Sequence, residues 1–149
     1  MGTEVEEFLA DVLPKQVAAV RAYHNGDVQP RLATWSHRDS VTLFGAWVPL
    51  NSGWDNLRRT FASIASRFAE SRDFRIEVVA AGASGDLAYL AAIEHDVMNI
   101  DGASRTVTMR STHIYRREDG EWKIVHRHSD FPPAANPVLP GAPDANYRS

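Results

Sequence analysis

The sequence has no cysteine, and this absence removes several kinds of chemistry at once. Disulfide bonds, thiolate nucleophiles and cysteine-ligated zinc or iron-sulfur centres are all excluded. No apolar run reaches membrane-spanning length, and the acidic start MGTEVEEF has neither the basic nor the apolar region of a signal peptide. We therefore expect a cytoplasmic protein with no membrane partner.

A strong charge of one sign is also lacking, since the formal net charge is -3 and the arginines are scattered along the chain. Proteins that neutralise phosphates usually carry a clustered basic field, so we expect no nucleic-acid partner. What is present is an ordinary globular composition. The 149 residues, 44% hydrophobic and 23% charged, are enough for one domain with a real core.

The first half of the chain carries helical patterns. A capping-box pattern at Thr3 precedes apolar residues at helical spacing, which predicts a helix up to Asn25-Gly26 that is kinked or restarted at Pro14. The elements expected next are a short helix from Asp27 through Trp35, short strands at 40–44 and 47–50, and a long helix after Ser52.

The second half changes to strand patterns separated by turn residues. The predicted strands are 74–83, 87–97, 105–117 and 121–131, and the separators are rich in Gly and Asp. Helices followed by an antiparallel meander predict an α+β architecture in which a curved sheet and helices enclose a cone. Five of the eight prolines fall in 132–149, which predicts an extended or disordered tail after a single domain over 1–131.

Several stretches together resemble a known superfamily. They are HNGDVQPRLATWSHRDSVTLFG, GWDNLRRTFASIASRF, GDLAYLAAIEHD and STHIYRREDGEWKIVHRHSDFP, and they span roughly residues 5 to 131. The chain is similar to the nuclear transport factor 2-like (cystatin-like) superfamily, closest to its SnoaL-like and ketosteroid-isomerase-like branches and to the calcium/calmodulin-dependent kinase II association domain. The resemblance implies a cone-shaped curved sheet with N-terminal helices on its concave face. It also implies a homodimer through the outer sheet face.

The segment EWKIVHRHSDF leaves open which side chains enter the cone. Because strand side chains alternate, His126 and His128 share one face while Arg127 and Ser129 share the other. The resemblance implies that Arg127 and Ser129 face inward. Hydrophobicity favours the opposite, since Trp122 shares the face of the histidines.

Two histidines are candidates for proton transfer. The resemblance places His113 at a pocket position, and an imidazole with an ordinary pKa near 6.5 suits acid–base work near neutral pH. His95 shares the inferred inward parity on a neighbouring strand with Ala91. The alternatives are a buried or interfacial histidine at His113 and a partly solvated strand end at His95.

The predicted substrate-binding residues are Arg127, Ser129, Trp47 and Tyr23. An inward Arg127 would be a buried cation that needs compensation, either by a carboxylate-bearing ligand or by an internal partner. The internal candidates are Glu94, Asp130 and Asp39.

Two more specific chemistries are not supported. The general base and the second acid of ketosteroid isomerase fall at Phe44 and near Thr112, neither of which ionises usefully. His126 and His128 lack the later glutamate and histidine of a cupin metal site, so we expect no metal and no cofactor.

Two function classes stay open. The first is a SnoaL-like domain that binds a small, largely apolar molecule with a carboxylate or carbonyl group, and acts as a cofactor-free isomerase, dehydratase or cyclase by histidine acid–base chemistry. The second is a non-catalytic ligand-binding or oligomerisation module. A fold of this kind holds many functions, so the sequence alone does not name the substrate.

Overall fold

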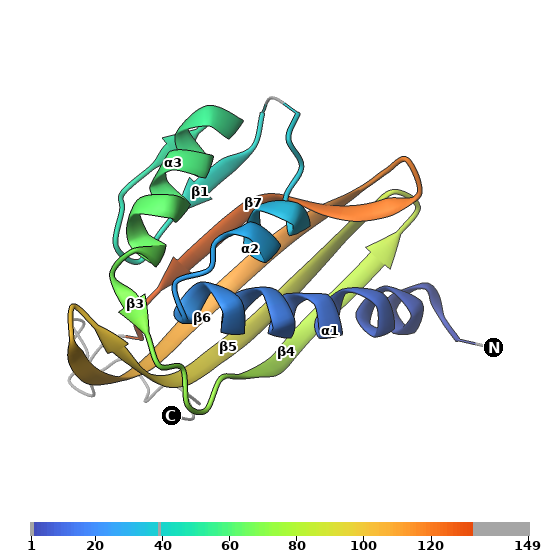
Figure 1. Ribbon diagram of the computed structural model, residues 1–149. Coiled ribbons are helices and arrows are strands. Elements are labelled where there is room, and N and C mark those ends of the chain that lie inside the picture. The colour runs from blue at the N-terminus through green and yellow to red at the C-terminus, as the bar shows by residue number, and fades with distance from the viewer. Residues whose placement is uncertain (1, 39, 133–149) are drawn as a thin grey trace, which may run out of the picture.

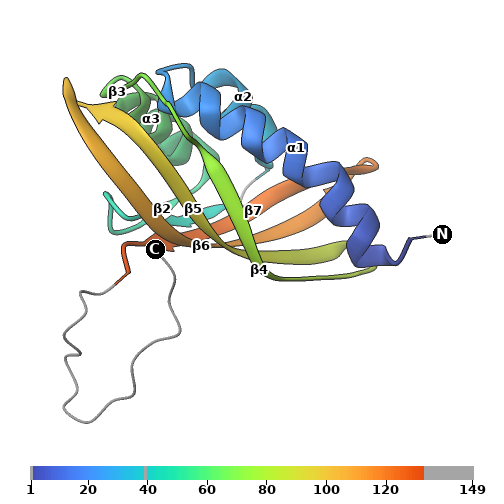
Figure 2. The ribbon, with the colours of Figure 1, turned by 90° about the horizontal axis from the view of Figure 1, so that it is seen from below.

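A computed structural model describes residues 2–38 and 40–132. Seven strands form one strongly curled sheet, and three helices lie on its concave side (Figures 1 and 2). This confirms the predicted α+β cone. The predicted tail lies outside the described residues apart from Pro132, and so does Asp39.

The long first helix crosses the open face of the sheet. Helix α1 spans Glu4–His24, and the Thr3 hydroxyl accepts from the Glu6 N–H at 3.2 Å, as the capping pattern predicts. The helix continues through Pro14, which is exposed to solvent. Helix α2 spans Gln29–Thr34 and helix α3 spans Trp54–Ala65, and each helix buries one face against the core.

Four long strands make up most of the sheet, close to the predicted ranges. The strands are β1 (Thr42–Phe44), β2 (Asn51–Ser52), β3 (Phe68–Ala69), β4 (Arg75–Ser84), β5 (Leu87–Ile100), β6 (Ala103–Glu118) and β7 (Glu121–Asp130). Their order is β2-β1-β7-β6-β5-β3, with β4 also paired to β5. The short strand β1 runs parallel to β7 and joins the first half of the chain to its end.

Two local predictions are wrong, and two predicted hairpin turns are confirmed. Residues 47–50 are not a strand but part of the connection between β1 and β2, where the Gly45 N–H donates to the Val48 carbonyl at 3.0 Å. The short strand β3 was not predicted, because Phe68 continues the apolar spacing of α3. The turns Asp101-Gly102 and Asp119-Gly120 have positive φ at both residues, as two-residue hairpin turns require.

A β-bulge at Val125 settles which side chains enter the cone. The register of β6 against β7 shifts so that Ile114 pairs with His126 while Tyr115 pairs with Ile124. One extra residue in a strand reverses the facing of everything beyond it. Trp122 and Ile124 therefore face inward on one side of the bulge, and Arg127 and Ser129 face inward on the other. The hydrophobicity argument is therefore correct for the part of β7 before the bulge, and the argument from resemblance is correct for the part after it.

Candidate functional site

An ion pair lies buried inside the cone. Arg127 on β7 donates from its two Nη atoms to the two carboxylate oxygens of Glu94 on β5, at 2.7 and 3.2 Å. The residues are 3% and 2% exposed. Burial alone would raise the pKa of Glu94, but the adjacent Arg127 guanidinium outweighs it and holds that pKa well below its usual range. The charge of Arg127 is thus compensated internally, by one of the three predicted partners.

His113 completes this group in a fixed tautomer. Its Nε2 lies 3.0 Å from Arg127 Nη1, and a guanidinium can only donate, so Nε2 accepts and the proton sits on Nδ1. Nδ1 is buried without a partner in the part of the chain that the structure describes. Burial and the positive charge of Arg127 lower the pKa of His113 well below its usual value. The expectation of an ordinary pKa near 6.5 is therefore wrong, and His113 is a neutral imidazole at neutral pH.

A second buried arginine has no acidic partner. Arg31 on α2 is 4% exposed, and its guanidinium lies over the rings of Tyr23 and Phe61, 4.4 and 4.9 Å from their centres. Within residues 2–38 and 40–132 it forms no ion pair, and its Nε has no hydrogen-bond partner. Burial, then repulsion by Arg127, lowers the pKa of Arg31 to about 10, so it remains charged at neutral pH. Arg31, Arg127 and Glu94 together therefore carry one positive charge in excess.

Arg31 was not among the residues predicted from the sequence. The available signal was an arginine within the short, mostly apolar helix QPRLAT, next to the buried Trp35. Which way Arg31 points depends on how α2 is seated, and that is a tertiary property.

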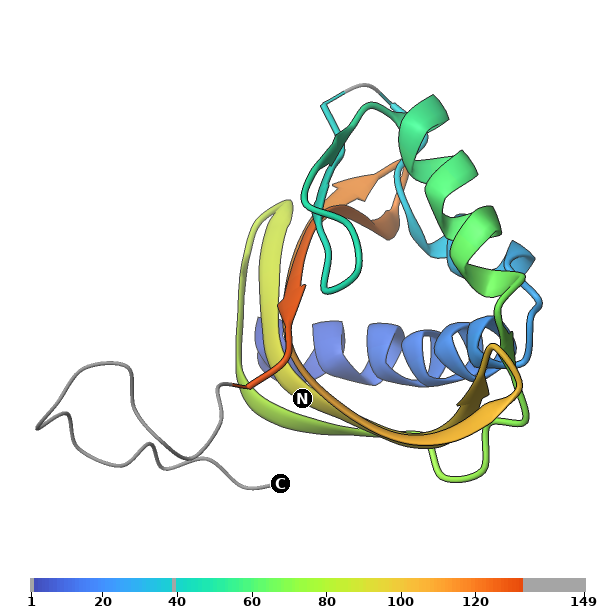
Figure 3. The same cartoon turned by 90° about the vertical axis from the view of Figure 1, so that its left-hand side faces the viewer.

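Both arginines reach a small cavity in the cone. Its volume is about 30 Å³, room for about one or two water molecules. The predicted residues Tyr23, Trp47, Arg127 and Ser129 all line it, together with Arg31. The β1–β2 connection, which carries Trp47, projects into the mouth of the cone (Figure 3). This connection closes the cavity on that side, and Trp47 itself is 38% exposed.

A histidine–aspartate pair also lies at this cavity. His24, which lines the cavity, shares a 2.7 Å hydrogen bond between its Nδ1 and Asp96 Oδ2. Asp96 also accepts from the Ser71 hydroxyl and from the backbone N–H groups of Asp73 and Val97. Burial would raise the pKa of Asp96, but these hydrogen bonds lower it to about 2. No period or motif in the sequence joins His24, at the end of α1, to Asp96, which lies within β5.

The structure does not bring His95 to this site. On β5, Glu94 and Asp96 are among the residues that face inward, whereas His95 lies on the convex face opposite Thr108, with Glu77 at 3.5 Å. The prediction that Ala91 and His95 face inward is therefore wrong, because the inward-facing positions of β5 are offset from them by one residue. His126 and His128 are also on the convex face, where His126 Nδ1 lies 2.6 Å from the Thr42 hydroxyl.

The described ranges contain neither a cluster of metal ligands nor a helix that could span a membrane. No group of three or more His, Asp or Glu residues there is arranged to hold a metal ion. No helix there combines the length and the apolar character needed to cross a bilayer.

The architecture and the buried polar interior agree with a family model, the SnoaL-like domain, which matches residues 16–134. The chain belongs to the SnoaL-like domain family. The comparison with curated proteins gave no match.

Solved structures share the fold of this SnoaL-like domain. A putative dehydratase of the NTF2-like family from Streptomyces avermitilis is 18% identical with a TM-score of 0.70, covering 87% of this chain and 99% of that one. A ketosteroid isomerase-like protein from Erwinia carotovora atroseptica is 19% identical with a TM-score of 0.67, covering 83% and 95%. A putative kinase type II association domain from Thiobacillus denitrificans is 18% identical with a TM-score of 0.67, covering 80% and 93%. At these identities the likeness establishes the fold alone.

Proposed function

We propose that this SnoaL-like domain binds a small, largely apolar molecule in the cone and holds its carboxylate or carbonyl oxygen at Arg31. The observation that carries the proposal is the unpaired buried charge of Arg31 beside a cavity. A buried cation without a partner is costly, and an anionic or strongly polar oxygen offsets that cost. Arg127 also lines the cavity, but its charge is already compensated by the ion pair with Glu94.

The body of the ligand needs more room than the cavity of about 30 Å³ offers. The β1–β2 connection must move outward to admit it, with Trp47 then lining the bound molecule. In this arrangement Tyr23 and Phe61 form an aromatic wall beside the oxygen-bearing end.

An isomerase, dehydratase or cyclase without a cofactor is the catalytic form of this proposal. His113 is poorly placed as a base, because the lone pair of its Nε2 already accepts from Arg127. His24 is better placed, since Asp96 engages Nδ1 and Nε2 forms no hydrogen bond with the described residues. Arg31 would then stabilise the oxyanion that forms as His24 removes a neighbouring proton.

Matched ligands test the binding proposal. Benzoate should raise the melting temperature of the wild-type protein and bind more tightly than benzamide, which has the same shape without the charge. Arg31→Met should weaken benzoate binding about 10- to 150-fold, the range for one lost charge-assisted hydrogen bond, as measured by calorimetry. Arg58→Met, at an exposed arginine of α3, is the control. An unaffected Arg31→Met would remove the proposal, and equal binding of benzoate and benzamide would remove its carboxylate form.

The second candidate function is assembly. The convex face carries exposed apolar side chains of Phe44, Tyr89, Leu87 and Ile114, and monomers seldom leave such groups uncovered together. Two solved structures with this fold are described as putative association domains. A homodimer through this face would cover these side chains.

A further inference from the structure

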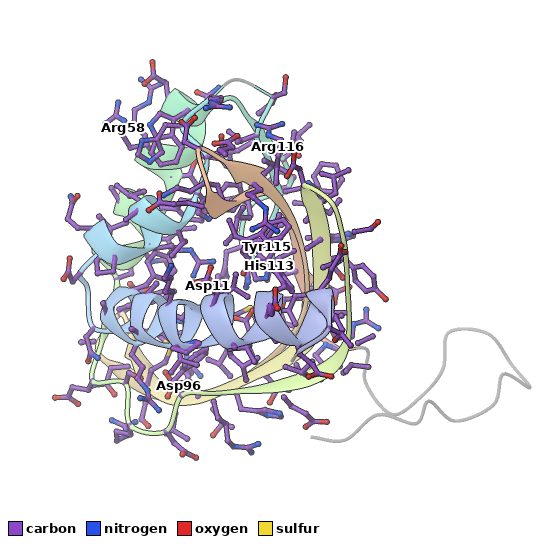
Figure 4. The ribbon with its side chains drawn as sticks, turned by 90° about the vertical axis from the view of Figure 1, so that its right-hand side faces the viewer. Asp11, Arg58, Asp96, His113, Tyr115 and Arg116 are labelled. Carbon is purple, nitrogen blue, oxygen red and sulfur yellow. The ribbon has the colours of Figure 1, made fainter. Side chains whose placement is uncertain are left out.

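A second and larger pocket opens on the opposite side of the cone from Trp47. It has a volume of about 420 Å³ and lies between α1, α2 and the end of the β6–β7 hairpin. Figure 4 looks onto this side, with Tyr115 in the space between α1 and the sheet. No residue lines both this pocket and the cavity of Arg31, so the two are separate sites.

The walls of this lateral pocket are mainly apolar. Val12 and Ala19 of α1, Pro30 of α2 and Trp122 of β7 contribute to the lining. The volume lies at the lower end of the range of small-molecule sites, about 300 to 1,000 Å³. The pocket therefore suits an apolar body of one or two rings.

Two polar side chains of the lining, Gln16 and Tyr115, make no hydrogen bond with the described residues. Gln16 and Tyr115 are 3% and 2% exposed. In the described part of the chain the Gln16 amide makes no hydrogen bond, and the Tyr115 hydroxyl is buried without one. The Tyr115 hydroxyl is enclosed by protein, whereas the Gln16 amide is not fully enclosed and has no hydrogen-bond partner among the described residues, so Gln16 is the group that can bind an oxygen from a ligand.

The charges at the rim, in contrast, are already paired. Lys15 Nζ lies 2.9 Å from Asp11, and Lys123 Nζ lies 3.4 Å from Glu121 and donates to the Ala33 carbonyl at 2.9 Å. Among the described lining residues no cation lacks a partner, in contrast to Arg31 in the other cavity. The occupant of the lateral pocket therefore needs no charge.

We propose that the lateral pocket is a binding site for a neutral one- or two-ring apolar molecule carrying a single hydroxyl or carbonyl oxygen. The rings lie against Trp122 and α1, and the oxygen exchanges hydrogen bonds with the Gln16 amide. This site does not depend on the anion site at Arg31, so either proposal can fail while the other stands.

The test compares 2-naphthol with naphthalene, which share one carbon skeleton, by NMR titration of the wild-type protein. 2-Naphthol should bind about fivefold more tightly, the worth of one net hydrogen bond. Gln16→Leu should cut this ratio to less than half, because it keeps the apolar bulk and removes the polar partner of the ligand oxygen. Arg31→Met should leave 2-naphthol binding unchanged.

A blocking variant locates the site. Ala18 lines the pocket from an exposed position of α1, so Ala18→Trp should fill the pocket without disturbing the core and abolish 2-naphthol binding. Ala10→Trp, at another exposed position of the same helix, is the matched control and should bind normally. The proposal is overturned if naphthalene and 2-naphthol bind equally, if neither binds, or if Ala18→Trp binds like the wild type.

Discussion

At the scale of single residues, the two buried arginines differ in one respect that decides their behaviour. Arg127 is held by Glu94, whereas Arg31 has aromatic rings as neighbours and no carboxylate in ion-pair contact among the described residues. The same substitution therefore has different consequences at the two positions.

Arg127→Met should lower the free energy of unfolding by about 3 to 5 kcal/mol, because it leaves Glu94 as an uncompensated buried charge. Arg31→Met should change it by less than about 1 kcal/mol, since the lost cation–π contacts are offset by the removal of an unpaired charge. Urea unfolding measures both values. Adding Glu94→Leu to Arg127→Met should recover most of the loss, and a double variant no more stable than Arg127→Met would contradict the account.

The pKa of Asp96 sets an acid-dependent part of the stability. Its folded value, about 2, lies below the ordinary aspartate value, so the contribution is complete above about pH 4 and is lost as the pH falls towards 2. The loss should be about 2 kcal/mol in the wild type. Asp96→Asn should be less stable at pH 6 and should show a smaller decrease between pH 4 and 2, as measured by urea unfolding at each pH. Parallel pH curves for the two proteins would contradict this assignment.

At the scale of elements, the bulge of β7 decides the composition of the interior. Deleting Val125 removes the extra residue and forces either Ile124 or Arg127 onto the wrong face. The deletion should lower the free energy of unfolding by at least about 3 kcal/mol, since Ile124 is fully buried and Arg127 is paired. Val125→Ala, which keeps the residue count, should cost about 1 kcal/mol. Near-equal stability of the two variants in urea would show that the bulge does not fix the facing.

The bulge also explains how much of the structure could be predicted from the sequence. Period, turn residues and resemblance predicted the long strands and the cone, because these signals are local or shared across the family. The inward facing of Arg127 was predicted, but a strict alternation over the whole of 121–131 could not also accommodate Trp122 and Ile124. At a bulge the alternation of inward and outward side chains shifts by one residue, and nothing in the sequence of β7 marks the position of the bulge. The same one-residue uncertainty explains the error at His95 on β5.

At the scale of the whole molecule, we expect a homodimer through the convex face. Phe44 lies edge-on to the rings of His126 and His128 among the exposed apolar side chains of this face. Burial and then the neighbouring His128 lower the pKa of His126, so its charged form is disfavoured there. Protonation between about pH 8 and 5 should weaken the dimer, because it places charge in an apolar contact.

Sedimentation equilibrium at pH 8 and at pH 5 measures this effect. His128→Gln should leave benzoate and 2-naphthol binding unchanged while reducing the pH dependence of dimerisation. Phe44→Ser should favour the monomer at both pH values. A wild-type protein that is monomeric at micromolar concentration at pH 8 would remove the dimer.

The parallel pairing of β1 with β7 has a consequence for how the protein is made. Thr42 meets His126, 84 residues further along the chain, so β1 and the helix that follows it leave the ribosome long before their partner exists. At about 5 to 20 residues per second the delay is roughly 5 to 15 s, while folding of a domain with such distant contacts takes about milliseconds to seconds. During this interval Leu43 and Phe61 have no finished sheet to cover them. Synthesis, not folding, then sets the time for which this apolar surface is open to chaperones and to aggregation.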